Sequence, residues 1–446
     1  MVKISRREFL EKSGRTAVGV GLGAMLGSTM TSQAAVAASS KKPSANDKIL
    51  IGCIGVGGMG MANMSNLLNN ADCEVVAVCD VDSRRMEEAA AEVEKRRGKK
   101  PLMIKDFRKV LEMNEINAVS IGTPDHWHAL PMILAAEAGK DVYVEKPISH
   151  DITEAKAMVA AAKKYGTVVQ CGTWQRSVQH FVDANAFIQS GKMGKIHICR
   201  AWICGPAGTG KEKPCDPPKE LDWDFWIGPA KFEAYRPNIA PGQFRWYFNY
   251  ASGMAGDWGA HMMDTVLQGM RDWHPLEAAS YGGKFVSGED DDRTTPDTQI
   301  AIYKFRDWIL QWEVHVGEPG LDGGAGHGAE FIGDNGVLRV DRGGCTYTAK
   351  GDSPKEGPTT VEKLTSDHWR NFLDCVKSRE LPRSDIYSMS YSNALCHLAN
   401  LTHLLGRSVK WNGEKQEVVG DKEAARIQSY YREYRKPWVL PRHDKG

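Results

Sequence analysis

Apolar and polar residues follow two different rhythms along this chain. Through residue 171, short apolar runs typical of buried strands alternate with longer amphipathic stretches typical of helices. This pattern predicts strands over 49–54, 73–79, 117–122, 141–144 and 167–171, and helices over 59–69, 83–96, 128–138 and 152–165. Such alternation indicates a parallel sheet with helices on both of its faces.

The second half of the chain has longer apolar runs, which are typical of an antiparallel or mixed sheet. They cover 196–203, 299–305 and 308–315, and further helices are predicted near 257–270, 367–378 and 387–405. Asp334-Asn335-Gly336 separates two apolar arms and predicts a hairpin. The Pro-, Gly- and Trp-rich stretch 204–250 is long for a connection, and ordered loops of that length are usually functional.

The first predicted strand runs directly into a glycine-rich turn that opens a helix. Its residues are Gly55, Val56, Gly57, Gly58, Met59 and Gly60, with the G-x-G-x-x-G spacing of a dinucleotide-binding turn. Glycine allows a tight turn, close approach of the backbone to a pyrophosphate, and close packing of helix on strand. The helix N-terminus then offers unpaired N–H groups to the phosphates. We expect this turn to bind the cofactor.

The second predicted strand ends in Asp80, 20 residues beyond Gly60. A carboxylate at that place accepts hydrogen bonds from the ribose hydroxyls and repels a 2′-phosphate, so we expect NAD rather than NADP. Arg84 and Arg85 follow closely and could bind a 2′-phosphate, or could simply be solvated helix charges.

The N-terminus is typical of an export signal. Ser5-Arg6-Arg7-Glu8-Phe9-Leu10 has the twin-arginine pattern, followed by a weakly apolar, glycine-rich segment and a small-residue stretch that ends at Ala37. The apolar part is too short for a stable membrane span. We expect the twin-arginine translocation machinery to export the folded protein to the periplasm. Because a periplasm supplies little free NAD, the cofactor should be tightly bound.

Composition excludes some classes of partner. The chain has 57 basic and 56 acidic residues and a formal net charge of +1, so no nucleic-acid partner is expected. Its ten cysteines are scattered without zinc-finger spacing and are interpreted mostly as core thiols.

Glu145-Lys146-Pro147 follows the predicted strand 141–144 directly. Ligands of open α/β sheets bind at the carboxyl ends of the strands, which is where this pattern places Lys146. The proline disfavours a helical conformation for Lys146 and helps to aim its side chain out of the sheet edge.

Taken together, these motifs resemble those of the Gfo/Idh/MocA oxidoreductases, a family that includes glucose-fructose oxidoreductase and inositol 2-dehydrogenase. The resemblance rests on the glycine turn, Asp80, Thr123-Pro124 with His128, Glu145-Lys146-Pro147 and Gly256-Asp257-Trp258-Gly259-Ala260-His261. It implies an α/β protein in which a Rossmann domain precedes an α+β domain with a large mixed, mostly antiparallel sheet. It also implies hydride exchange with a sugar or cyclitol, and homodimers or homotetramers.

The predicted domain boundaries follow from these features. We expect a signal peptide over 1–37, a linker over 38–47, an NAD-binding Rossmann domain over 48–172, and a substrate-binding and oligomerisation domain over 173–446.

The resemblance implies that Lys146, Asp257 and His261 are catalytic. The i,i+4 spacing of Asp257 and His261 on one helix would let the carboxylate orient the imidazole, although Asp257 could also simply cap the helix. Histidine can take the hydroxyl proton as hydride departs, and Lys146 can stabilise the developing alkoxide. Which of the two is formally the base is left open.

The loop after strand 117–122 should lie beside the cofactor. The resemblance implies cofactor contacts from Thr123, Pro124, Asp125 and His128, and from Glu145 and Lys146 after the next strand. His126 and His128 could alternatively ligate zinc, but no suitable third ligand stands out, so no metal is expected.

Four residues are candidates for substrate binding. Gln175 and Arg176 could bind substrate hydroxyls or form structural bonds across the domain junction, and Asp264 could share the site or lie in solvent. Trp246 belongs to an aromatic cluster that could stack on a pyranose ring or form core.

We therefore expect an exported NAD(P)-dependent oxidoreductase that acts on a hydroxyl of a sugar, sugar derivative or cyclitol. The alternative is a redox-neutral, NAD-dependent glycoside hydrolase or lyase that oxidises and then re-reduces its substrate around a tightly bound cofactor.

Overall fold

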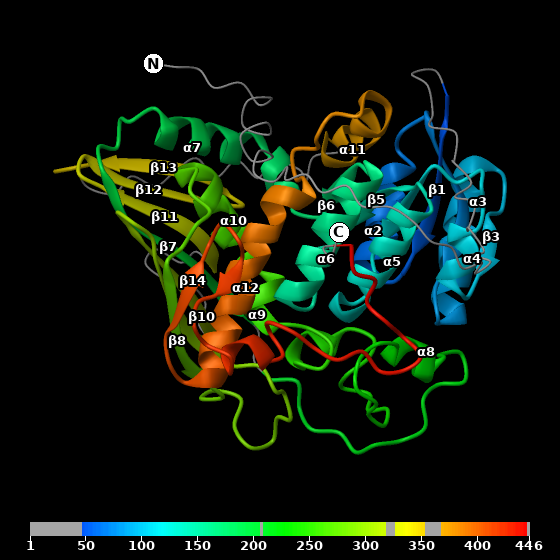
Figure 1. Ribbon diagram of the computed structural model, residues 1–446. Coiled ribbons are helices and arrows are strands. Elements are labelled where there is room, and N and C mark those ends of the chain that lie inside the picture. The colour runs from blue at the N-terminus through cyan, green and yellow to red at the C-terminus, as the bar shows by residue number, and fades with distance from the viewer. Residues whose placement is uncertain (1–46, 206–207, 318–325, 353–366, 444–446) are drawn as a thin grey trace, which may run out of the picture. The chain divides into compact units, whose positions relative to one another are not determined.

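The first sheet is parallel and six-stranded. A computed structural model describes residues 47–205, 208–317, 326–352 and 367–443 (Figure 1). The strand order is β3-β2-β1-β4-β5-β6, and each pair of neighbours is parallel. The strands are β1 (Ile49–Ile54), β2 (Cys73–Cys79), β3 (Leu102–Ile104), β4 (Ala118–Ile121), β5 (Asp141–Val144) and β6 (Val169–Cys171). This is the Rossmann architecture predicted from the strand–helix alternation.

The helices that connect these strands begin and end at residues suited to those positions. They are α2 (Gly58–Leu67), α3 (Ser83–Arg97), α4 (Phe107–Leu111), α5 (Ala129–Glu137) and α6 (Ile152–Tyr165). Side chains of Asp82 and Asp151 accept hydrogen bonds from backbone N–H groups at the starts of α3 and α6, and left-handed Gly98 and Gly166 end the same helices. The short elements β3 and α4 were not predicted.

The second sheet is mixed and has nine strands in the order β13-β12-β11-β7-β10-β9-β8-β14-β15. Only the β7–β10 pairing is parallel among the described pairs. The strands are β7 (Ile196–Gly205), β8 (Glu277–Gly283), β9 (Thr298–Lys304), β10 (Ile309–Val316), β11 (His327–Gly333), β12 (Gly336–Asp341), β13 (Gly344–Ala349), β14 (Val409–Asn412) and β15 (Glu417–Val418). The hairpin predicted at Asp334-Asn335-Gly336 is confirmed as the β11–β12 turn.

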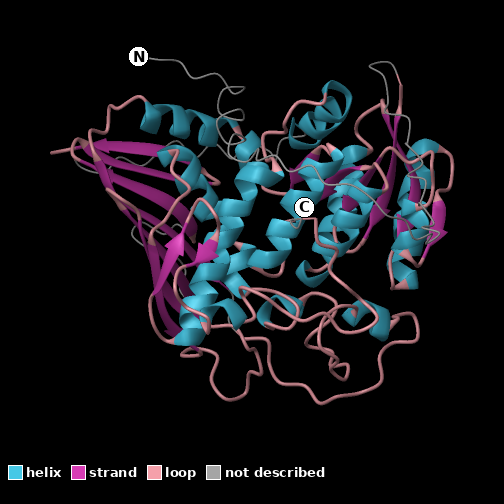
Figure 2. Cartoon of the chain, viewed as in Figure 1, coloured by secondary structure: helices cyan, strands magenta, loops and turns pink. Residues whose placement is uncertain are grey.

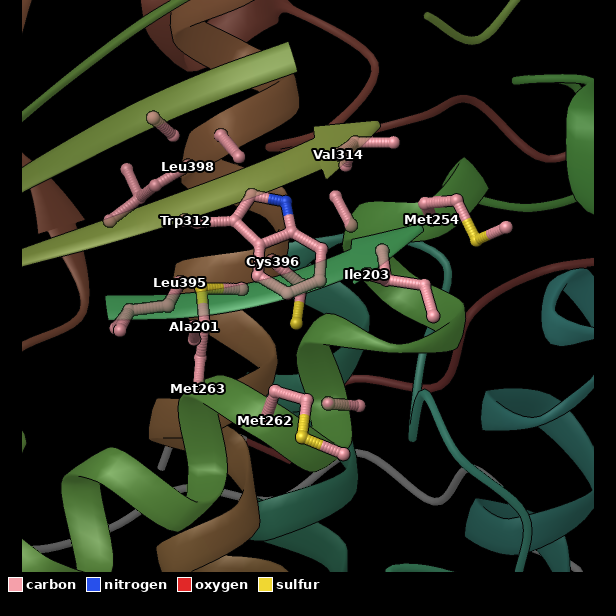
Figure 3. Close-up of a cluster of buried hydrophobic side chains, with 14 of the residues drawn as sticks. Ala201, Ile203, Met254, Met262, Met263, Trp312, Val314, Leu395, Cys396 and Leu398 are labelled. Carbon is pink, nitrogen blue, oxygen red and sulfur yellow. The ribbon is translucent and has the colours of Figure 1, made fainter. Parts of the chain in front are cut away.

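Helices cover one face of this second sheet, as Figures 1 and 2 show. They include α7 (Gln179–Gln189), α10 (Gly259–Met270) and α12 (Ile386–Leu405). Figure 3 shows part of the resulting core, where Trp312 of β10 lies among side chains from β7, α10 and α12. The other face of the sheet leaves Ile300, Ile302 and Ile309 exposed.

Two helices from late in the chain join the sheet domains. Helix α12 packs against β8 on one side and against α6 of the Rossmann domain on the other. Helix α11 (Asp367–Ser378) inserts Trp369 and Phe372 into the core that also contains Ile49 and Ile51 of β1. The first domain is therefore completed by residues from the C-terminal end of the chain.

The helix predicted over 257–270 is interrupted, which corrects that expectation. Helix α9 (Gly253–Asp257) ends one residue before Trp258, and α10 begins at Gly259. Asp257 and His261 therefore lie on two consecutive helices instead of one regular turn. No helix in the described part of the chain is long and apolar enough to span a membrane. The predicted signal peptide, with its twin-arginine pattern, lies outside the described residues.

Candidate functional site

The glycine-rich turn has the geometry that a dinucleotide requires. Gly55 has a φ of 75°, and a Cβ on Gly60 would lie 1.8 Å from the carbonyl oxygen of Gly55, so helix and strand meet too closely for any side chain. A Cβ on Gly58 would meet nothing within 4 Å, which leaves open space at the start of α2. The Gly60 N–H donates to the Gly57 carbonyl oxygen, but no side chain caps that helix N-terminus, so no side-chain cap competes with an anion there.

Asp80 lies in the pocket beside this turn. The pocket is lined by Gly55, Gly57, Asp80, Val81, Arg85, Thr123 and Pro124, together with Phe107, Trp127, Phe225 and Trp226 among others. The Asp80 carboxylate accepts hydrogen bonds of 2.9 Å from the backbone N–H groups of Val56 and Asp82. Arg85 packs against Gly57 and borders the pocket, whereas Arg84 pairs with Asp82.

The loop after β4 is buried, and its polar side chains include Asp125 and His128. Burial raises the pKa of Asp125 to about 7, and the charge of Arg245 opposes that rise. The ring nitrogens of His128 lie 2.6 Å from the Pro147 carbonyl oxygen and 2.7 Å from that of Thr123. His128 thus lies between two loops, and its predicted contact with the cofactor stays a prediction.

The zinc alternative at His126 gains nothing from the structure. The ring of His126 lies 2.9 Å from the Trp226 carbonyl oxygen, and the described residues contain no group of three or more His, Cys, Asp or Glu side chains that could hold a metal.

Lys146 extends from the end of β5 to the second domain. Its Nζ donates to Asp257 Oδ1 at 2.5 Å and to the Asp257 carbonyl oxygen at 3.0 Å. The Glu145 carboxylate instead accepts a hydrogen bond of 2.8 Å from the Asn63 side chain. A Cβ on Gly172 would collide with that carboxylate. Lys146 and Asp257 therefore meet at the junction of the two domains.

Asp257 also binds Arg245, whose Nε lies 3.3 Å from Oδ1. Burial pushes the pKa of Asp257 upward, but the charges of Lys146 and Arg245 outweigh burial and hold that pKa well below its ordinary value. The carboxylate is thus ionised and shared by two cations.

His261 lies beside this ion pair and is 2% exposed. Burial first, and then the Lys146 charge, lower the pKa of its imidazole well below the ordinary value. Its Nδ1 makes no hydrogen bond to the described residues, so the carboxylate–imidazole bond expected from i,i+4 spacing is absent. The break at Trp258 and the competition of Lys146 and Arg245 for the carboxylate explain that difference.

Arg176 and Asp264 form an ion pair with each other. Arg176 makes two hydrogen bonds to the Asp264 carboxylate, of 2.9 and 2.6 Å, and Ser392 donates to the same carboxylate. Asp264 is fully buried. This bidentate pair holds α10 to the domain junction, which is the structural alternative predicted for Arg176, and the substrate-binding role of either residue stays a prediction.

Trp246 lies in the aromatic core. Its ring is 7% exposed and stacks on the guanidinium of Arg293, 5.0 Å away. The Gln175 side chain accepts hydrogen bonds from Arg342, and the ring of the preceding residue, Trp174, lies 6.0 Å from the His261 ring.

Sequence reasoning missed several residues around His261. The Trp258 ring centroid lies 6.2 Å from that of the His261 imidazole, and the His327 ring of β11 lies 4.7 Å from the Trp258 ring in a tilted arrangement. Arg342, in the turn between β12 and β13, lies over the Trp174 and Trp258 rings. The hairpin predicted at Asp334-Asn335-Gly336 is an earlier turn of the same sheet, and no pattern at Arg342 singled it out in the sequence.

Comparisons with known proteins agree with the fold. Residues 49–173 match the family GFO_IDH_MocA, described as "Oxidoreductase family, NAD-binding Rossmann fold", and residues 197–277 match its "C-terminal alpha/beta domain". The matches to the Gfo/Idh/MocA oxidoreductases thus cover the Rossmann domain and the first part of the second domain.

Among the relatives, the chain is 34% identical over 145 residues to a scyllo-inositol 2-dehydrogenase (NAD(+)) of Bacillus subtilis strain 168, covering 32% of this chain and 40% of that one. It is 28% identical over 181 residues to a glycosyl hydrolase family 109 protein of Shewanella pealeana, covering 36% and 38%. The matches thus span about two-fifths of these relatives.

The whole fold is shared more widely than the sequence. The WlbA dehydrogenase of Bordetella pertussis, whose crystal structure contains NADH and UDP-GlcNAcA, superposes with a TM-score of 0.62 at 16% identity. The superposition covers 81% of this chain and 98% of that one. At this identity the likeness shows the fold alone.

We predict that activity will not titrate at the ordinary histidine pKa. Because the lowered pKa keeps His261 neutral, the rate at which substrate reduces bound NAD should show no inflection near pH 6.5 in an Asp125→Asn variant, which removes the neighbouring carboxyl whose pKa burial raises to about 7. A solvated imidazole base would instead lose activity as the pH falls through about 6.5. Single-turnover rates of that variant between about pH 5.5 and about pH 7.5 check the prediction, and a loss of activity centred near pH 6.5 contradicts it.

Proposed function

We propose that this protein transfers hydride between NAD and a carbon that bears a hydroxyl on a sugar, sugar derivative or cyclitol. One observation carries the proposal: Lys146 from the Rossmann domain and Asp257 from the second domain meet at 2.5 Å, with a neutral, buried imidazole beside them. A cation and a proton acceptor together are what removal of an alcohol proton with departure of hydride requires.

The residues of the first domain fit a nicotinamide dinucleotide. The Gly55–Gly60 turn and the open N-terminus of α2 suit its pyrophosphate, and Asp80 suits an adenosine ribose. Bound there, the cofactor would accept or return the hydride. Thr123 and Pro124 line this pocket, and the next residue, Asp125, is close enough to Asp257 and Lys146 for their charges to change its pKa.

The chain's own residues divide the proton chemistry. Lys146 donates a hydrogen bond to the substrate oxygen and stabilises negative charge on it as the proton leaves. Neutral His261 receives the proton, because Asp257 is held ionised by two cations and is a very weak base. Asp257 is a positioning residue that aims the Lys146 ammonium.

Asp80 supports NAD over NADP. A 2′-phosphate would meet its carboxylate, which burial and backbone hydrogen bonds already fix in place. Arg85 and Lys105 also line the pocket and are cations that would favour the phosphate, although Lys105 pairs with Asp222. Purified protein should release NAD, and not NADP, when it is denatured.

Lys146→Ala and His261→Ala should each abolish reduction of bound NAD by substrate while leaving the nucleotide in place. The reason is that both side chains serve the substrate oxygen, and the glycine turn is untouched. Nicotinamide absorbance in single turnover measures the rate, and the nucleotide released on denaturation measures occupancy. Lys163→Ala, an exposed lysine of α6, is the matched control. Unchanged rates in either active-site variant would refute the assigned roles.

A second candidate is redox-neutral cleavage of glycosides, favoured by the similarity to a glycosyl hydrolase family 109 protein. In that cycle, oxidation of one ring carbon acidifies its neighbour, a leaving group is eliminated, and the hydride returns. A panel of free sugars and aryl glycosides separates the two: a dehydrogenase accumulates reduced nicotinamide, whereas a hydrolase or lyase releases aglycone without net reduction.

Export to the periplasm by the twin-arginine route is supported by the Arg6-Arg7 pattern. Because that route carries folded proteins, the cofactor would be loaded beforehand and held tightly. Replacing both arginines by lysine should retain the protein in the cytoplasm of its host, as judged by cell fractionation. Unaltered delivery of this variant to the periplasm would contradict the proposal.

Self-association into a homodimer or homotetramer is supported by the apolar side chains on the open face of the nine-stranded sheet, including Ile300, Ile302 and Ile309. Light scattering on the purified protein tests this, and the molar mass of a single chain would contradict it.

A further inference from the structure

One arginine beside His261 has aromatic neighbours and lacks an anionic partner. The guanidinium carbon of Arg342 lies 4.5 Å from the Trp174 ring centroid and 4.2 Å from that of Trp258. The same two indole rings flank the His261 imidazole, at 6.0 and 6.2 Å. Arg342 therefore belongs to the wall of the site that contains His261, although it comes from a distant hairpin turn.

The hydrogen bonds of Arg342 are few and long. Its Nε and one terminal nitrogen each lie 3.3 Å from Gln175 Oε1. Within the described ranges no carboxylate lies within 4.0 Å of the guanidinium, and the neighbouring Asp341 carboxylate accepts from the backbone N–H groups of Gly343 and Gly344 instead. An arginine has five N–H donors in a planar fork, so most of this donor capacity is unused.

Polar atoms of neighbouring side chains are also without partners. Gln175 is 1% exposed and its Nε2 makes no hydrogen bond to the described residues, and the same holds for Nε2 of His327. A buried polar atom without a partner is costly, which points to a ligand that supplies one. Burial also lowers the pKa of Arg342 to about 10, with Asp257 the main charge that opposes the shift.

The other two cations of the site already have acidic neighbours. Lys146 and Arg245 share the Asp257 carboxylate, and the buried carboxyl groups of Asp125 and Glu145 also act on Arg245. Among the described residues, Arg342 has no carboxylate within ion-pair distance, and the Asp257 charge acts on it only from farther away. A planar guanidinium between two aromatic rings presents one edge, and a carboxylate matches that edge with two parallel hydrogen bonds.

We propose that Arg342, aligned by Gln175 and the Trp174 and Trp258 rings, binds a carboxylate on the substrate, so that the substrate is an acidic sugar such as a hexuronic acid or its glycoside. This inference rests on the proposed function for the identity of the reacting site. It adds a substrate class, because the sugar hydroxyl meets Lys146 and His261 while the acid group meets Arg342.

The test compares three substrates that differ at one carbon: a hexose, the corresponding hexuronic acid and the hexose 6-phosphate. The wild type should prefer the acid in kcat/KM for reduction of NAD. Arg342→Gln should lower kcat/KM for the acid by about tenfold to hundredfold and leave the neutral hexose nearly unchanged, because a charge-assisted bidentate contact is lost. Arg342→Lys keeps the positive charge but lacks the planar guanidinium. Its kcat/KM for the acid should lie between those of the wild type and Arg342→Gln.

Arg306→Gln is the control, since it removes one positive charge from an exposed turn between β9 and β10. A merely structural role of Arg342 would lower kcat/KM for all three substrates equally, and that result overturns the inference. A wild-type preference for the phosphate or for the neutral hexose also overturns it. Thermal unfolding and nucleotide content show whether each variant folds.

Binding without turnover separates this inference from the proposed function. Binding of the hexuronic acid should quench the fluorescence of Trp174 and Trp258, and Arg342→Gln should weaken that binding by a similar factor. Binding that depends on Arg342 without any reduction of NAD would refute the proposed function and leave the carboxylate site standing. Reduction of NAD by the acid with no effect of Arg342→Gln would refute the carboxylate site and leave the proposed function standing.

Discussion

The ion pair between Lys146 and Asp257 is the contact on which the site depends. One partner follows strand β5 of the parallel sheet, and the other ends helix α9 of the second domain. Their side chains are only 13% and 19% exposed, so the attraction acts in partly dry surroundings where it is stronger than in water. Removing either partner would leave a charge that is costly to keep there.

The two sheets are the rigid supports of this contact. The parallel sheet places the glycine turn, Asp80 and Lys146 at the carboxyl ends of its strands, where a dinucleotide and its substrate can meet. The mixed sheet supports α10, which carries His261, and its β12–β13 turn brings Arg342 to the same place. Helix α12 fastens the sheets to each other, because it packs against both β8 and α6, and α11 completes the core of the Rossmann domain.

Local patterns predicted the Rossmann half well. Strands β1, β2 and β5 and helix α6 have the predicted bounds, because each is a single apolar or amphipathic run between clear breaks. The glycine turn and Lys146 were also placed correctly on their elements, since both follow strands directly. The predicted cofactor, catalytic and substrate roles of these residues stay predictions.

The parts that could not be predicted depend on contacts between distant residues. The break at Trp258 arises in a stretch whose spacing favours one helix, and the bonds that occupy His128, Arg176 and Asp264 come from other elements. The position of Arg342 follows from the order of strands in the second sheet, which no local pattern encodes. Helix α11 likewise lies beside β1 although some 300 residues of chain separate them.

A crystal structure of the protein with NAD tests the central claim most directly. The account predicts that the nicotinamide ring will lie between the two domains with its reactive carbon facing the space shared by Lys146 Nζ and the His261 imidazole. A nicotinamide ring bound away from these two groups would contradict the account and leave only a nucleotide-binding fold.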